Sequence, residues 1–70
     1  MVRLKVKEVA QEKGINMSKL SRIADVSYNT VLAIYHDPYH DVSLYILDRL
    51  SQALHTPICD LIEQIPDTEN

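Results

Sequence analysis

A link of only three residues, 25–27, separates two segments of this chain that both have the sequence pattern of a helix. The first segment, 17–24, follows Asn16, and the second, 28–35, follows Ser27; both preceding residues are good N-caps. Apolar residues recur at helical spacing in each segment. Because so short a link leaves no room for a wide loop, the two helices have to meet at a steep angle, which is the geometry of a helix-turn-helix.

Three further segments also show apolar residues at helical spacing. They are residues 5–13, which end at Gly14, residues 44–54, which follow a serine cap, and residues 57–64, which begin with a proline. The apolar residues at the N-terminus also alternate, so residues 1–5 are either extended or helical. Five helices joined by short breaks predict an all-α fold, a compact five-helix bundle that contains the helix-turn-helix.

Length and composition limit the other fold classes. Of the 70 residues, 46% are hydrophobic and 24% are charged, which is enough apolar surface to exclude a disordered chain. One glycine and no Phe or Trp argue against a β-sandwich or barrel with many tight turns. We expect one domain over residues 1–66 and a frayed acidic tail at residues 67–70. A core of this size nets only about 3–5 kcal/mol, so we expect an oligomer or very regular helix packing.

The charges are divided unevenly along the chain. Residues 1–35 hold six basic and three acidic side chains, a net charge of +3, although the whole chain carries −3. Residues 36–70 hold one basic and seven acidic side chains, a net charge of −6. A polyanion would therefore be attracted by the first half and repelled by the second.

The single cysteine, Cys59, excludes an internal disulfide and a cysteine-based zinc cluster, and it suggests a reducing compartment. No apolar run at the N-terminus is long enough for a signal peptide or a membrane span, so we expect a cytoplasmic protein without a membrane partner. We interpret Cys59 as a small, semi-buried hydrophobic residue. A chain of this length rarely encloses a substrate pocket, so we expect no enzyme activity, no small-molecule substrate and no cofactor.

The spacing of His36 and His40 invites a metal-site interpretation, since two histidines four residues apart on a helix share one face. Pro38 lies between them and prevents a regular helix. We therefore expect a polar loop here and no metal site.

Residues 15–31 resemble the core motif of the Cro and phage-repressor type of helix-turn-helix domain, the XRE-like family with the lambda-repressor-like fold. In that family a capped helix carries Leu-Ala, a Gly-Val-Ser turn follows, and a second helix carries Thr-Ile. The corresponding residues here are Leu20-Ser21, Asp25-Val26-Ser27 and Thr30-Val31. Further downstream, residues 43–54 resemble the fourth helix of the family, and residues 60–62 resemble its closing motif, so the resemblance covers residues 4–65.

Two residues depart from the family pattern. Asp25 replaces the turn glycine, and aspartate is among the few other residues that tolerate left-handed backbone geometry. Ser21 replaces an alanine packed between the two helices; it is small enough, and its hydroxyl can donate to a carbonyl of the preceding turn. Both substitutions are compatible with the fold.

The resemblance implies a sequence-specific DNA-binding transcriptional regulator, a repressor, that reads the major groove with helix 28–35. The N-terminal end of that helix approaches the base edges, where the amide of Asn29 can pair with adenine N6 and N7. Ala33 is the next outward position and is small enough for close approach. From this helix we expect contacts with double-stranded DNA by Ser27, Tyr28, Asn29, Thr30 and Ala33. Arg and Lys are absent from residues 27–35, which points to an A·T-rich site or to affinity from other elements.

Those other elements are the start of the first motif helix and the loop that follows the second. The free N–H groups of Met17 and Ser18 can bind a phosphate, and Lys19 and Arg22 can add cationic contacts. The remaining candidates for phosphate contacts, near or within the loop, are Tyr35, His36, Tyr39 and His40, although Asp37 and Asp41 would oppose them. The alternative for all these side chains is an ordinary solvated surface.

One copy contacts too little DNA for tight specific binding, so we expect a homodimer on a pseudo-palindromic operator. The candidate residues of the dimer surface, or alternatively of the monomer core, are Val2, Leu4, Ile58, Ile62 and Ile65. An alternative function on the same fold is a protein–protein interaction module such as an antitoxin or an adaptor. The acidic second half and the missing cations of residues 27–35 favour that alternative.

Overall fold

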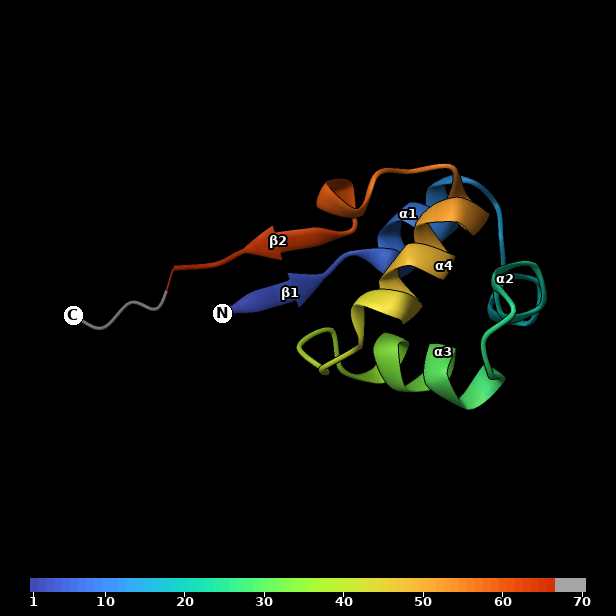
Figure 1. Ribbon diagram of the computed structural model, residues 1–70, viewed down its shortest axis with the longest axis horizontal. Coiled ribbons are helices and arrows are strands. Elements are labelled where there is room, and N and C mark those ends of the chain that lie inside the picture. The colour runs from blue at the N-terminus through green and yellow to red at the C-terminus, as the bar shows by residue number, and fades with distance from the viewer. Residues whose placement is uncertain (67–70) are drawn as a thin grey trace.

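The computed structural model describes residues 1–66, and the expected tail at residues 67–70 lies outside the described residues. The helices form the body of the molecule, and two short strands project from it at one end (Figure 1). In chain order the elements are β1 (Val2–Leu4), α1 (Val6–Glu12), α2 (Met17–Ala24), α3 (Tyr28–His36), α4 (Leu44–Leu54), a 3-10 turn η1 (Ile58–Asp60) and β2 (Ile62–Gln64).

The three inner helices begin where side-chain caps place them. The Asn16 side chain accepts a hydrogen bond from the third N–H of α2 at 2.8 Å. Ser27 and Ser43 do the same for α3 and α4, both at 3.1 Å. These bonds satisfy donors that the first turn of a helix leaves free. The expected bounds of α2 and α4 are confirmed, and α3 continues one residue further, to His36.

The N-terminus is extended, which decides between the two conformations that the sequence left open. β1 pairs antiparallel with β2, with Leu4 opposite Ile62 and Val2 opposite Gln64. Leu4 also donates its N–H to the carbonyl of Pro38 at 2.6 Å, which ties the strand to the α3–α4 loop. The side chain of Leu4 is only 5% exposed, so the strand closes one end of the core.

The predicted fifth helix over residues 57–64 is wrong, and with it the five-helix, all-α description. A single 3-10 turn forms there and the chain then becomes a strand. The backbone groups that a helix would bond internally are used by β1, since Leu61 accepts from Lys5 at 2.7 Å and Ile65 donates to Met1 at 2.8 Å. A lone β1 would leave its own groups unpaired, so pairing satisfies both segments. Cys59, in the turn, is exposed rather than semi-buried.

The core lies where the four α-helices, β1 and the residue after η1 meet. Within the described residues, α2 contacts both α3 and α4, and α1 contacts the same two helices. The side chains that are almost completely buried are Val6, Leu20, Val31, Leu50, Leu54 and Leu61. These contacts hold α3 by its inner face and leave its other side to solvent. None of the helices within residues 1–66 is both long and apolar enough to cross a lipid bilayer.

Candidate nucleic-acid interface

The junction between α2 and α3 is a tight, hydrogen-bonded bend. Asp25 ends α2 in the left-handed conformation, with φ 58° and ψ 45°, as expected for the residue in the place of the turn glycine. Val26 then donates its N–H to the carbonyl of Ser21 at 3.1 Å. The hydroxyl of Ser21 donates to the Ser18 carbonyl at 2.9 Å, which confirms the bond expected from that substitution. The chain therefore leaves α2 and reaches the N-cap of α3 within three residues.

An arginine of α4 braces this junction from the other side. Arg49 donates from Nε to the carbonyl of Ala24, the last residue of α2, at 2.9 Å, and from Nη2 to the Asp25 carboxylate at 2.8 Å. The guanidinium also lies 5.7 Å from the centre of the Tyr45 ring, within the range of a cation–π contact. The sequence carried no signal for this contact, because Arg49 and Asp25 belong to different helices.

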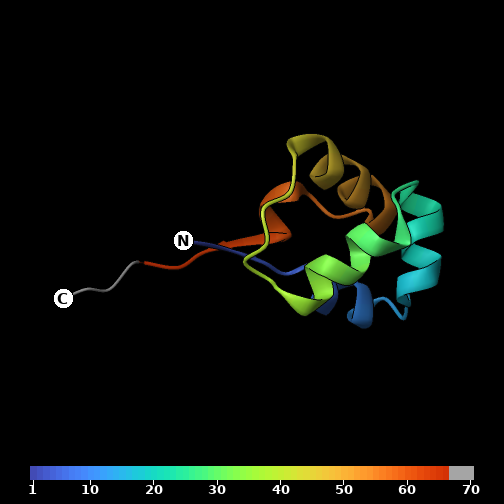
Figure 2. The ribbon, with the colours of Figure 1, turned by 90° about the horizontal axis from the view of Figure 1, so that it is seen from below.

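The far side of α3 is open to solvent. Val31 and Ile34 are buried against the other helices, whereas Tyr28 is 44% exposed and Asn29 is exposed. Seen from below, α3 lies across the face of the molecule, with α2 at its N-terminal end and α1 beside its C-terminal half (Figure 2). No part of the described chain covers the N-terminal tip, so Tyr28 and Asn29 can reach a partner.

The hydroxyl groups at this tip already have partners within the chain. Ser27 Oγ accepts from the N–H of Thr30 and lies 2.8 Å from the Thr30 hydroxyl. Thr30 is half-buried, and Ala33 is half-buried one turn further along. Among the expected base-contacting residues, the structure therefore places Tyr28 and Asn29 outermost, with Ser27 and Thr30 holding the turn from which they project.

The first turn of α2 presents the other expected contacts. Asn16 caps the N–H of Lys19, while the N–H groups of Met17 and Ser18 have no acceptor within the described chain. Ser18 and Lys19 are exposed. Free N–H groups in the first turn of a helix, with a nearby cation, are a suitable environment for an anion such as a phosphate.

Arg22 is also exposed, on the last turn of α2. Arg22 and Lys19 form no ion pair within residues 1–66, in contrast to Arg49, which is engaged with Asp25. Their charge is therefore available to a partner of opposite sign.

The outward face of α3 includes His36, which was expected to contact phosphate from the loop, and Leu32, for which no DNA contact was expected. Leu32 is half-buried and His36 is exposed, three and seven residues after Asn29. Residues at these spacings share one helix face, so the helical period could have identified them. His36 was assigned to the loop because the helix was expected to end at Tyr35.

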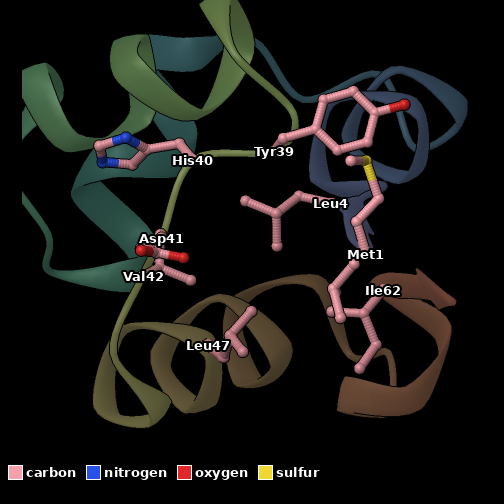
Figure 3. Close-up of a pocket in the computed structure, with 9 residues that line it drawn as sticks. Met1, Leu4, Tyr39, His40, Asp41, Val42, Leu47 and Ile62 are labelled. Atoms are coloured by element: carbon pink, nitrogen blue, oxygen red, sulfur yellow. The ribbon is translucent and has the colours of Figure 1, made fainter. Parts of the chain in front are cut away.

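The other expected loop residues lie at a separate surface. Tyr39 and His40, both exposed, border a hollow of about 440 Å³ between β1, the α3–α4 loop and α4. Figure 3 shows the Leu4 side chain in the middle of this hollow, with the Tyr39 ring turned toward Met1. Tyr39 is thus oriented toward the N-terminal strand, away from the tip of α3.

Tyr35 is half-buried on the last turns of α3. Its hydroxyl oxygen is buried and has no hydrogen-bond partner among the described residues. Burial raises the pKa of this hydroxyl, because the charged form loses hydration. Tyr35 therefore offers a neutral donor that the chain itself does not use.

The spacing of His36 and His40 does not bring a set of metal ligands together within residues 1–66. No three His, Cys, Asp or Glu side chains within residues 1–66 lie close enough together to hold a metal ion. His36 ends α3 and His40 lies beyond the Asp37 turn, where the Asp37 side chain accepts from the Tyr39 N–H at 3.0 Å.

Together, α2 and α3 form a capped helix, a tight turn and a second helix with an exposed N-terminal tip. A comparison with protein families matches residues 5–67 to the Cro/C1-type helix-turn-helix DNA-binding domain. A comparison with curated proteins gave no match. The family match spans nearly the whole chain and includes both motif helices. The chain belongs to the Cro/C1-type helix-turn-helix DNA-binding domain family.

Proposed function

We propose that this protein is a sequence-specific transcriptional repressor that inserts the N-terminal tip of α3 into the major groove. The observation that carries the proposal is the exposure of Tyr28 and Asn29 on a helix whose opposite face, Val31 and Ile34, is fully packed. A major groove about 12 Å wide admits a helix with its side chains. A protein seated there excludes other proteins from the same stretch of DNA, and that exclusion is sufficient for repression.

Sequence would be read chiefly by Asn29. Its amide can both donate to adenine N7 and accept from adenine N6, which discriminates against a wrong base by about 1–3 kcal/mol. Tyr28 can contact sugar or phosphate beside it. The phosphates of the DNA backbone would be bound at α2, by the N–H groups of Met17 and Ser18 and by the side chains of Lys19 and Arg22. These contacts would set the register of α3 in the groove.

We further propose that the protein acts as a homodimer through the outer edge of β2. Lys5 bonds to Leu61, so the alternation of an antiparallel ladder directs the backbone groups of Ile62 and Gln64 away from β1. No third strand pairs with β2 within residues 1–66. An open strand edge is a template for pairing with another chain, and two copies of β2 can pair around a two-fold axis.

The side chains near this edge define what the dimer can bury. Val2 is 46% exposed and Ile62 and Ile65 are half-buried, so all three can contribute apolar surface. Leu4 is 5% exposed and belongs to the monomer core, which removes it from the expected dimer contacts. Ile58 is half-buried against the same core.

One observation favours a second function, a protein-binding module such as an antitoxin or an adaptor. Leu44 is 78% exposed and Tyr45 is 62% exposed, and both lie on the first turn of α4. Large exposed apolar side chains of this kind are typical of protein-binding surfaces. The absence of Arg and Lys from α3 agrees with this alternative.

The test is selection of a random duplex library on the full chain, followed by titration of selected and scrambled duplexes at two salt concentrations. We expect enrichment of two inverted half-sites about 34 Å apart and affinity that falls steeply with salt. No retention of DNA at low salt, with a bound protein partner recovered instead, would favour the second function.

A further inference from the structure

The outer edge of β1 is only partly paired. Lys5, which follows β1, donates its N–H to the carbonyl of Leu61, which precedes β2. The alternation of an antiparallel ladder therefore directs the backbone groups of Val2 and Leu4 to the other side of the strand. On that side the N–H of Leu4 donates to the carbonyl of Pro38. No third strand continues from this bond within residues 1–66, so the N–H and C=O of Val2 face outward.

The apolar hollow of about 440 Å³ lies directly beside this open edge. Its walls come from β1, from the α3–α4 loop and from α4. In Figure 3 the Leu4 side chain extends from β1 into the hollow, and Leu47 of α4 borders it from another side. We call the open edge and the hollow together the β1 groove, and its principal residues are Val2, Leu4, Tyr39, Asp41, Val42 and Leu47.

The loop that forms one wall of the groove is held by hydrogen bonds. The Asp37 side chain accepts from the N–H of Tyr39 at 3.0 Å, and the Asp37 carbonyl accepts from the N–H of His40 at 2.9 Å. The bond between Leu4 and Pro38 ties the same loop to β1. A site that is shaped before its partner arrives loses less conformational entropy on binding.

Exposed apolar side chains gather around the groove. Seven large apolar side chains are exposed within residues 1–66, and three of them, Met1, Val2 and Tyr39, line the hollow. Two more, Leu44 and Tyr45, lie along the chain between two residues that line it. An apolar hollow with an apolar rim is typical of a protein-binding surface.

The side-chain charge that borders the hollow is negative. Asp41 is exposed and forms no hydrogen bond or ion pair within residues 1–66. Among those residues no lysine or arginine lines the hollow, and the Met1 ammonium is bonded to the carbonyl of Ile65. A second copy that paired through β2 would bring Glu63, another acid, to this edge. Charge complementarity therefore favours a basic segment of a different protein.

We propose that the β1 groove binds an extended, basic segment of a partner protein, which adds to β1 as a third strand. Hydrogen bonds to the N–H and C=O of Val2 would continue the pairing that Pro38 begins at Leu4. Alternate side chains of such a strand point to one face, so apolar residues at every second position would enter the hollow. A cation between them would reach Asp41.

Binding at this groove does not depend on the proposed reading of DNA by α3. Figure 1 shows β1 and β2 at the end of the molecule away from α2 and the start of α3. A partner could therefore occupy the groove while the tip of α3 lies in the major groove, which would join the regulator to a second protein on the DNA.

The experiment selects a displayed library of random peptides on the full chain, and the enriched peptides are then synthesised and titrated. We expect sequences in which apolar residues occupy alternate positions and which contain lysine or arginine. Hydrogen exchange of the Val2 amide should slow when the peptide binds, because this N–H gains an acceptor. A library without enrichment, or bound peptides that leave exchange at Val2 unchanged, would show the proposal to be wrong.

A pair of proline variants tests which edge is used. Val2→Pro removes the outward N–H, keeps an apolar side chain and takes no bond from the β1–β2 ladder. It should weaken peptide binding by about 2–10-fold, the effect of one hydrogen bond. Gln64→Pro is the matched control, because it removes a donor from the outer edge of β2 instead. Equal affinities of the two variants for the peptide would rule out pairing at β1.

A second pair of variants tests the charge. Asp41→Asn should weaken the peptide several-fold and reduce the effect of salt on its affinity, because an attraction between opposite charges is lost. Asp60→Asn is the control, since Asp60 is also exposed but lines a separate hollow beside α1. The same loss for both variants would contradict a specific contact with Asp41.

Sedimentation and DNA titration of the same variants separate the remaining outcomes. If the wild-type chain self-associates and Val2→Pro dissociates it, a second copy occupies the groove and the proposal is wrong. If the peptide binds as expected but the chain binds no duplex, the groove stands and the proposed function is wrong. Circular dichroism melting of each variant distinguishes loss of contact from loss of fold.

Discussion

The carboxylate of Asp25 and the guanidinium of Arg49 meet at 2.8 Å across the junction of α2 and α3. Asp25 stands in the left-handed conformation, where glycine is the residue without a steric penalty. The same arginine donates to the carbonyl of Ala24, one of the groups that the end of α2 leaves without an intrahelical partner. Arg49 therefore fixes the bend from which the orientation of α3 follows.

We predict that Arg49→Ala is more destabilising than Asp25→Gly. Arg49→Ala leaves the Ala24 carbonyl without its charged donor, which costs about 1–2 kcal/mol. Asp25→Gly removes the left-handed strain, but it also loses an exposed ion pair and increases the entropy of the unfolded chain, so we expect a change within about 1 kcal/mol. Urea unfolding of each variant measures both. A larger loss for Asp25→Gly than for Arg49→Ala would contradict this account.

The hydrogen bonds that join Arg3 to Glu8 and Glu63 predict that the stability of the fold depends on pH. Burial opposes ionisation of Glu8, but the hydrogen bond from Arg3, a backbone hydrogen bond and the charges of Arg3 and Lys7 outweigh it and lower the pKa of Glu8. A carboxyl whose pKa is lowered by folding stabilises the fold above its unfolded pKa, and that stabilisation is lost as pH falls through the folded pKa.

We therefore expect Glu8→Gln to lose stability at neutral pH but little in acid, below the usual pKa range of glutamate. The effect should stay below about 1 kcal/mol, because the Glu8 side chain is 45% exposed and solvent screens the pair. Thermal melts from pH 7 down to pH 3 measure it. Glu12→Gln is the matched control, since Glu12 lies on the same helix and forms no ion pair within residues 1–66. Identical pH profiles for the two variants would refute the prediction.

We predict that Gln64→Pro abolishes the dimer and leaves the monomer folded. The N–H of residue 64 points away from β1, so proline removes a donor from the outer edge and none from the β1–β2 ladder. Analytical ultracentrifugation and circular dichroism give the two readouts. Glu63→Pro is the contrasting variant, because residue 63 bonds to β1 and its loss should unravel the sheet. A Gln64→Pro protein that still sediments as a dimer would place the interface elsewhere.

We predict that Asn29→Ala and Lys19→Ala weaken DNA binding in different ways. Loss of the Asn29 amide should cost about 1–3 kcal/mol on the selected duplex and little on scrambled DNA, because the contact reads a base. Lys19→Ala should weaken binding to all sequences alike and flatten the salt dependence, because the contact is to phosphate. Anisotropy titrations on both duplexes measure this difference. Equal losses on cognate and scrambled DNA for Asn29→Ala would argue against base reading by this residue.

The motif helices could be predicted from the sequence because their signals are local. Asn16, Ser27 and Ser43 cap the helices that directly follow them, and the period of the apolar residues shows which face of each is buried. Asp25 and His55 end α2 and α4 in the left-handed conformation, in places where the sequence lacks the usual glycine. Each of these features depends on residues within a few positions along the chain.

The C-terminal segment could not be predicted in the same way. Ile58, Leu61, Ile62 and Ile65 have helical spacing, yet residues 62–64 form a strand because β1 offers this segment hydrogen bonds. This partner lies about sixty residues away in sequence, so no local pattern contains it. The same limit hid the bonds of Arg49 and the β1 groove, which depend on where distant segments of the chain pack.

The amino-acid sequence by itself determined the helix-turn-helix, its caps, its bend and the exposed polar tip of α3, because backbone hydrogen bonding and side-chain periodicity act over one or two helical turns. Only the tertiary structure decided that residues 62–64 form a strand, that Arg49 braces the bend, and that an apolar hollow borders the outer edge of β1. Those outcomes follow from long-range packing, which satisfies backbone groups and places charges between segments that are distant along the chain.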